Sequence, residues 1–144
     1  MPVVYAIYAA QKFIHTRCLG NVTTDETSDH FRALARDPNC PDRLNVLLDL
    51  LEMTSISRTD QIRGVILDLQ NVQRRVRFEN CAIVADNDAI FGMMRMFEVF
   101  AKDYFVSTRV LRGVAEAKAW LAPTEDAILR HARSSLYHRS TRSR

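Results

Sequence analysis

The sequence predicts an α/β domain with a mixed, mostly parallel sheet, and two patterns carry this prediction. Short apolar, β-branched runs alternate with longer segments in which apolar residues recur every three or four positions. Strands that alternate with helices favour a parallel sheet. The start of the chain differs, because two apolar runs follow each other closely and predict an antiparallel β-hairpin at one edge.

The first three elements have clear boundaries. The hairpin strands are expected over residues 3–10 and 13–19, separated by Gln11 and Lys12. A helix is expected to begin after Thr23, because Thr23-Thr24-Asp25-Glu26 matches a capping box, and to reach about residue 36.

A central strand is expected over residues 44–51, followed by a helix that begins at Ser57 and ends at about Arg74, with Arg77 closing it. A buried strand is expected over 81–85, then a helix up to about Tyr104, a strand over 108–112 and a helix over 114–121. The helix before Tyr104 has a broad apolar arc, predicted to be core: Ile90, Met93, Met94, Met96, Phe97, Phe100, Ala101 and Tyr104.

Length and composition indicate one globular domain. The chain has 144 residues, of which 47% are hydrophobic and 26% are charged. We expect residues 1–122 to form the α/β domain. Residues 123–144 are expected to form a C-terminal helix and a basic Arg/Ser tail that is partly disordered.

The charge distribution disfavours nucleic acid as a partner. The net charge of +3 resides in residues 125–144, and the rest of the chain has equal numbers of acidic and basic side chains. A nucleic-acid-binding domain would normally have a basic face. Neither a basic leader nor a membrane-spanning run is visible, and the three widely spaced cysteines predict buried thiols, so a cytoplasmic protein is expected.

Motifs of the common enzyme classes are absent from the sequence. It has no G-x-S-x-G, H-E-x-x-H, Walker or G-x-G-x-x-G motif, and its four histidines show no helical i,i+4 pairing. We therefore expect no enzyme, no cofactor and no metal site.

Four stretches of the chain carry a resemblance to a known family: residues 20–23 after the hairpin, Leu47-Leu48-Asp49-Leu50, Ala82-Ile83-Val84-Ala85-Asp86 and residues 115–121. Together they resemble the STAS family, the fold of bacterial anti-sigma factor antagonists, and in particular its SpoIIAA-like branch, which shares features with SEC14-type lipid-binding domains. The resemblance implies a regulatory role without catalysis.

In the antagonists of this family, a serine in the loop after the central strand is phosphorylated. Ser55 or Ser57 is the counterpart by position, although the Asp-Ser pair and the glycine of the family motif are missing, and Ser57 equally suits a helix N-cap. The carboxyl end of a central strand, followed by a helix N-terminus, predicts a loop that binds a partner or an anion. Its expected residues are Glu52, Thr54, Ser55, Ser57 and Arg58.

Two functions remain open. The first is a regulatory module that binds a protein partner, with a homodimer through Phe91 and Val99 as one form of association. The second is a carrier or sensor of a small apolar or lipid-like ligand, which the SEC14 kinship and the pliable methionines suggest. The residues of this second site, which equally suit core filling, are Met93, Met94, Met96 and Phe97.

Overall fold

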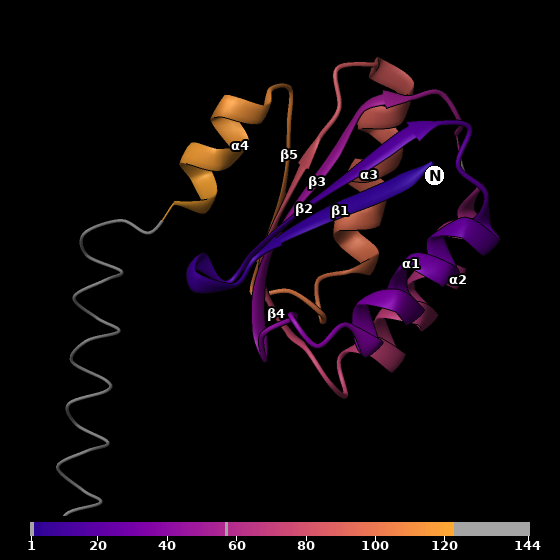
Figure 1. Ribbon diagram of the computed structural model, residues 1–144. Helices are drawn as coiled ribbons and strands as arrows, with labels where there is room; N and C mark the ends of the chain where they lie inside the picture. The colour runs from indigo at the N-terminus through magenta and orange to yellow at the C-terminus, as the bar shows by residue number, and fades with distance from the viewer. Residues whose placement is uncertain (1, 57, 123–144) are drawn as a thin grey trace, which may run out of the picture.

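A five-stranded sheet forms the centre of the protein (Figure 1), and the computed structural model describes residues 2–56 and 58–122. The strand order is β1-β2-β3-β4-β5; β1 and β2 are antiparallel, and the other neighbours are parallel. The predicted mixed, mostly parallel sheet with an initial hairpin is thereby confirmed. The strands are β1 (Val3–Tyr8), β2 (Phe13–Gly20), β3 (Arg43–Met53), β4 (Arg77–Val84) and β5 (Ser107–Leu111).

The described residues contain four α-helices: α1 (Thr24–Arg36), α2 (Thr59–Val72), α3 (Asp88–Phe100) and α4 (Val114–Leu121). The capping box of α1 is confirmed, because the Thr23 hydroxyl accepts from the Glu26 backbone N–H at 3.2 Å and the Glu26 carboxylate accepts from the Thr23 N–H at 3.1 Å. The C-terminal helix and tail predicted for residues 123–144 lie outside the described residues.

Several predicted boundaries are wrong. The strand expected over residues 81–85 begins four positions earlier, at Arg77, and the helix expected to reach Tyr104 ends at Phe100. Strand β1 ends at Tyr8, because a 3₁₀ turn and the left-handed Lys12 (φ 51°) form the hairpin connection. Helix α2 begins at Thr59 with Arg58 as its N-cap, one position later than the Ser57 cap that was expected. Arg77 does not close α2 but begins β4, where its N–H donates to the Asp42 carbonyl at 2.7 Å.

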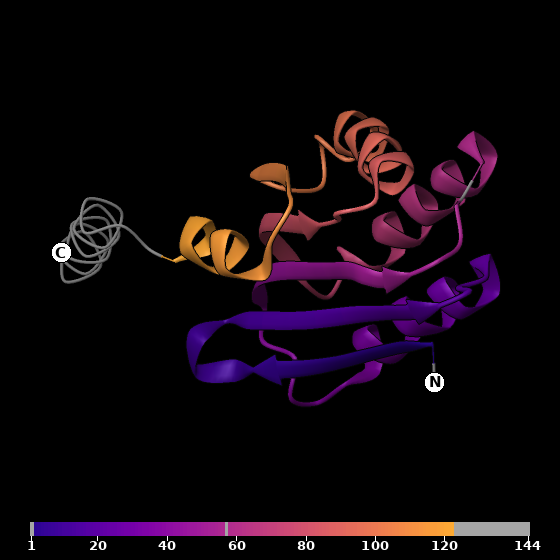
Figure 2. The ribbon, with the colours of Figure 1, turned by 90° about the horizontal axis from the view of Figure 1, so that it is seen from above.

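The helices cover the two faces of the sheet unequally (Figures 1 and 2). Helices α1, α2 and α3 pack on one face, here called the inner face, and α4 packs on the opposite, outer face. Ala117 and Leu121 of α4 belong to a small second core with Leu47 and Val84. Among the described helices, only α4 covers the outer face, and it reaches β3, β4 and β5.

Helix α4 covers one end of β3 on the outer face and leaves the other end exposed. This difference predicts that shortening a leucine side chain has different effects at the two ends of the strand. Leu47 is fully buried and Leu51 is 37% exposed. We expect Leu47→Ala to lower the free energy of unfolding by about 2 to 5 kcal/mol. Leu51→Ala, the matched control, should change it by less than about 0.5 kcal/mol, as is usual for surface positions. Urea denaturation measures both, and equal losses would contradict the assignment of α4 to the Leu47 end of the strand.

Candidate functional site

A cavity of about 490 Å³ lies between the inner face of the sheet and helices α1, α2 and α3. Its wall is mostly apolar and is formed by the inner faces of β1 to β4, the three helices, and the loops that precede α1 and α2. Central to the wall are Ile14, Val46, Leu48, Ile62, Val65 and Leu69. The cavity therefore lies in the inner core between α1, α2 and the sheet, and it adjoins Val46 and Leu48 most openly, since Ile14, Ile62 and Leu69 are at most 2% exposed.

The exposure of the central strand shows this hollow independently. On β3, Leu47 faces the outer side and is 0% exposed, whereas Val46 and Leu48 face the inner side and are only half-buried. A central strand with a filled core beneath it would have its inner residues fully covered. Leu44 and Leu50, at the two ends of the same face, are covered.

The cavity opens to solvent beyond the carboxyl ends of β2 and β3, where exposed residues join its lining. Asn21, Thr23 and Asp25 form one side of this mouth, and Ile56, which is 59% exposed, lies on the other. Ligands of open α/β sheets bind at this position, outside the carboxyl ends of the strands.

Ser55 joins the two sides of the mouth. Its hydroxyl accepts from the Val22 N–H at 3.0 Å and donates to the Val22 carbonyl at 3.3 Å. One residue earlier, the Thr54 N–H donates to the Gly20 carbonyl at 2.9 Å. The loop before α1 is thus tied to the loop before α2 at the edge of the cavity.

The structure divides the predicted recognition loop. Ser55 lies at the mouth, and Thr54 is an exposed neighbour. Glu52 lies on the outer face and pairs with Arg17, while the exposed Arg58 pairs with Asp60 at 3.3 Å. Ser57 lies outside the described residues. The four described residues of this loop do not form one surface, because a strand irregularity places Glu52 beside Arg17 on the outer face, away from Ser55 at the mouth.

The predicted cluster on α3 is divided as well. Met93, Met94 and Phe97 line the cavity. Met96 does not; it is 37% exposed, and its sulfur accepts from the Thr59 hydroxyl at 3.8 Å. The assignment of Met96 to the inner arc was wrong, since the arc drawn from periodicity was wider than the surface that the helix buries.

The two α3 residues expected to take part in self-association, Phe91 and Val99, differ in exposure. Val99 is 64% exposed. Phe91 is half-buried under the guanidinium of Arg112, whose Cζ lies 3.9 Å from the ring centroid. The same guanidinium donates to the Asp86 carbonyl and to Asp88.

His30 is a cavity residue that the sequence analysis did not single out. It lines the wall from α1 with Thr27, Phe31 and Leu34, and this 3-4 spacing would have identified it as part of the inner face. Its Nδ1 atom is buried without a hydrogen-bond partner. Burial lowers the pKa of His30 from 6.5 to about 4, so the imidazole is neutral at pH 7.

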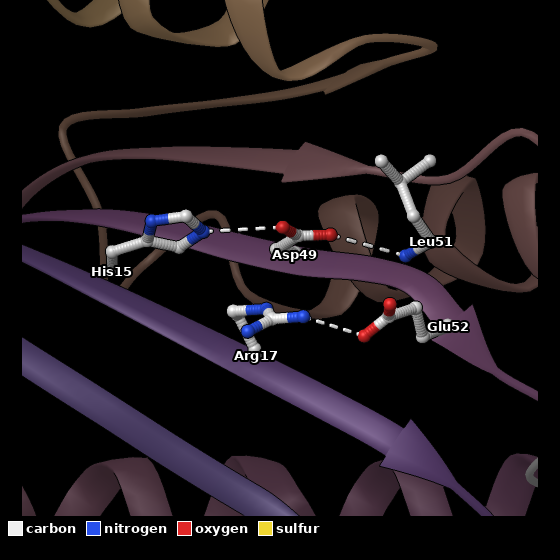
Figure 3. Close-up of polar contacts among 5 residues, drawn as sticks. All are labelled: His15, Arg17, Asp49, Leu51 and Glu52. Atoms are coloured by element: carbon white, nitrogen blue, oxygen red, sulfur yellow. Dashed lines mark hydrogen bonds and ion pairs between the residues drawn. The ribbon is translucent and has the colours of Figure 1, made fainter.

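The outer face has a polar strip of its own (Figure 3). His15 and Arg17 of β2 face Asp49 and Glu52 of β3, with N···O distances of 3.1 Å for His15–Asp49 and 2.6 Å for Arg17–Glu52. The second oxygen of Asp49 accepts from the Leu51 N–H at 3.1 Å. Along β2, Phe13, His15, Arg17 and Leu19 alternate with Ile14, Thr16 and Cys18, and this period of two shows that one side of the strand is partly polar but does not identify the partners.

Two features are missing from the described part of the chain. No group of three or more His, Cys, Asp or Glu side chains in it is placed to hold a metal ion. None of its helices has the length and apolar character needed to cross a membrane.

Comparison with known proteins identifies the fold. No protein-family model and no curated protein matches the chain. Among solved structures, it is similar to an uncharacterised protein of the DUF3478 family with a SpoIIAA-like fold from Shewanella loihica PV-4, with a TM-score of 0.55 and 11% sequence identity. The match covers 83% of this chain and 92% of the other. The chain has a SpoIIAA-like fold, as its sequence resemblance predicted.

The lowered pKa of His30 predicts a pH dependence of stability. Between pH 6.5 and pH 4 the unfolded chain binds a proton at His30 and the folded protein does not, so stability falls as the pH falls through this window. The loss attributable to His30 is on the order of 3 kcal/mol. Chemical denaturation of the wild type and of His30→Phe at pH 7 and pH 4 measures it as a difference.

The Tyr5 ring contacts His30, and the Tyr5 hydroxyl donates to Asp37. Tyr5 and Asp37 are both present in the wild type and in His30→Phe. Their contributions to the pH dependence therefore cancel when the two proteins are compared. We expect the wild type to lose more stability on acidification than the variant. Equal losses would show that His30 is not buried as a neutral imidazole.

Proposed function

We propose that this chain is a non-catalytic STAS-type domain that binds a small apolar ligand in the cavity beneath α1 and α2. The observation that carries the proposal is the hollow inner core. The sequence left open whether Met93, Met94 and Phe97 fill a core or line a ligand site, and all three lie on the wall of the cavity.

The size and chemistry of the cavity support this proposal. Small-molecule sites have volumes of about 300 to 1,000 Å³ and mostly apolar walls, and a cavity of about 490 Å³ lies within that range. At about 30 Å³ per water, it has the volume of roughly sixteen waters. Covalently bonded atoms occupy less volume each than separate waters, so a chain or ring system of about ten to twenty heavy atoms fits. Methionine side chains adapt to ligands of different shape, because they are unbranched and have three rotatable bonds.

A regulatory output through the mouth is a further part of the proposal. Ser55 and Ile56 belong both to the mouth and to the loop predicted to contact a partner. A ligand that displaces either residue changes the surface that a protein partner meets. The domain would then act as a sensor, in which occupancy of the inner cavity sets the affinity for the partner.

A cavity-filling variant tests ligand binding. We expect wild-type protein to bind the fluorescent apolar probe N-phenyl-1-naphthylamine, and Val46→Phe to weaken this binding at least tenfold, because the added ring occupies the centre of the cavity. Fluorescence titration measures both affinities. Organic extraction of freshly purified protein, followed by mass spectrometry, identifies a natural ligand.

Val4→Phe is the matched control for Val46→Phe. Val4 lies on β1 opposite Arg17, on the outer face, and does not line the cavity. This variant should bind the probe like the wild type. The proposal fails if the wild type does not bind the probe, or if the two variants bind it equally well.

The Ser55 link predicts a kinetic effect. Ser55→Ala removes both hydrogen bonds to Val22, which join the two loops of the mouth. We expect the probe to dissociate several-fold faster, since hydrogen bonds of this kind contribute about 0.5 to 1.5 kcal/mol each. Stopped-flow competition measures the rate. Thr54→Ala, an exposed neighbour whose side chain is not part of this link, should leave the rate unchanged.

A further inference from the structure

Thr16 and His30 are two polar side chains on the wall of the cavity. Thr16 of β2 is directly opposite Tyr5 in the antiparallel pair β1–β2, so their side chains share the inner face. The Tyr5 ring in turn contacts the His30 ring, with a centroid separation of 5.2 Å. Tyr5 therefore brings the Thr16 hydroxyl and the His30 imidazole to the same side of the cavity.

Neither side chain has a hydrogen-bond partner among the residues that the structure describes. Thr16 is 2% exposed, and His30 has a buried, unpaired Nδ1. Leaving a buried polar atom unpaired costs about 1 to 3 kcal/mol, which a bound ligand group can recover. Rotation of the imidazole by roughly 180° about χ2 exchanges Nδ1 with Cδ2 and Nε2 with Cε1. A ring nitrogen can therefore be turned toward a ligand without movement of α1.

The interior of the cavity carries no charge at neutral pH. Burial raises the pKa of the Cys18 thiol to about 11 and raises the pKa of Cys81 as well, so both thiols stay protonated. The third titratable group on the inner wall is His30, which is neutral. Asp25 also lines the cavity, but it is exposed at the mouth and not inside. An ionised ligand group would lie there without a counter-ion, which is strongly unfavourable.

We infer that the ligand is an apolar molecule with one uncharged hydrogen-bonding group, of the alcohol class, and that this group binds between His30 and Thr16 inside the cavity. The inference rests on the proposed ligand-binding function and deepens it. The polar groups at the mouth are a separate set, and Ser55 there is already paired with Val22. The apolar part of the ligand then extends along the methionine wall of α3.

The test compares ligands of equal chain length at pH 8. The affinities of 1-decanol and 1-chlorodecane are measured by displacement of N-phenyl-1-naphthylamine from the wild type and from His30→Phe. Because the chloroalkane cannot donate a hydrogen bond, the ratio of the two affinities reports the polar contact. We expect His30→Phe to lower the preference for decanol about tenfold, the effect of leaving a ligand hydroxyl unpaired.

Three further variants separate the polar contact from a structural effect. His30→Gln keeps a donor and an acceptor and should retain part of the preference for decanol. Thr16→Val should lower that preference. Tyr5→Phe keeps the ring against His30 but removes the hydroxyl that donates to Asp37, and it should leave the ratio at the wild-type value.

Each outcome is decisive. An affinity ratio that is the same in the wild type and in His30→Phe overturns the inference. Decanoate that binds more tightly than decanol, regardless of His30, also overturns it and places the head group at the mouth, while apolar ligand binding stands. Failure of the wild type to bind the probe and all three ligands refutes the proposed function itself.

Discussion

The parallel pairing of β2 with β3 is the constraint on which the other features depend. It runs from Phe13 opposite Asn45 to Gly20 opposite Met53. Its two ends are closed by backbone bonds of 2.8 Å (Asn45 N–H to the Lys12 carbonyl) and 2.9 Å (Thr54 N–H to the Gly20 carbonyl). Because both strands end at the same edge, the loops before α1 and α2 meet there, and the mouth of the cavity forms between them.

The same pairing produces different chemistry on the two faces of the sheet. On the outer face it places His15 beside Asp49 and Arg17 beside Glu52. The Arg17–Glu52 pair is solvent-exposed, so it contributes at most about 1 kcal/mol and serves mainly to fix the register. On the inner face it places Thr16 next to Val46 and Leu48, which line the cavity and are only half-buried.

The sequence predicted the order of the elements and the cap of α1, because both depend on local patterns. It could not predict the hollow core, since periodicity shows that Val46 and Leu48 point inward but not whether anything meets them. The same limit explains why Met96 was wrongly assigned to the buried side of α3: periodicity does not show how much of a helix its neighbours cover. The cover of Phe91 by Arg112 depends on a contact across 21 positions of the chain, which no local pattern reveals. His15–Asp49 and Ser55–Val22 are likewise contacts between distant segments.

The hollow core has an energetic consequence that links ligand binding to folding. Voids made by truncating core side chains cost about 24 cal/mol per Å³ of volume, so a dry void of about 490 Å³ would cost roughly 12 kcal/mol. That is comparable to the whole stability of a typical domain, about 5 to 15 kcal/mol. Water entering through the mouth relieves part of this cost, but it does not restore the dispersion contacts of the apolar wall. The proposed apolar ligand would restore them and would stabilise the folded state, by about 2.7 kcal/mol at a free concentration 100 times its Kd. On this proposal, the cavity that weakens the core is the feature that would make the stability of the fold respond to a ligand.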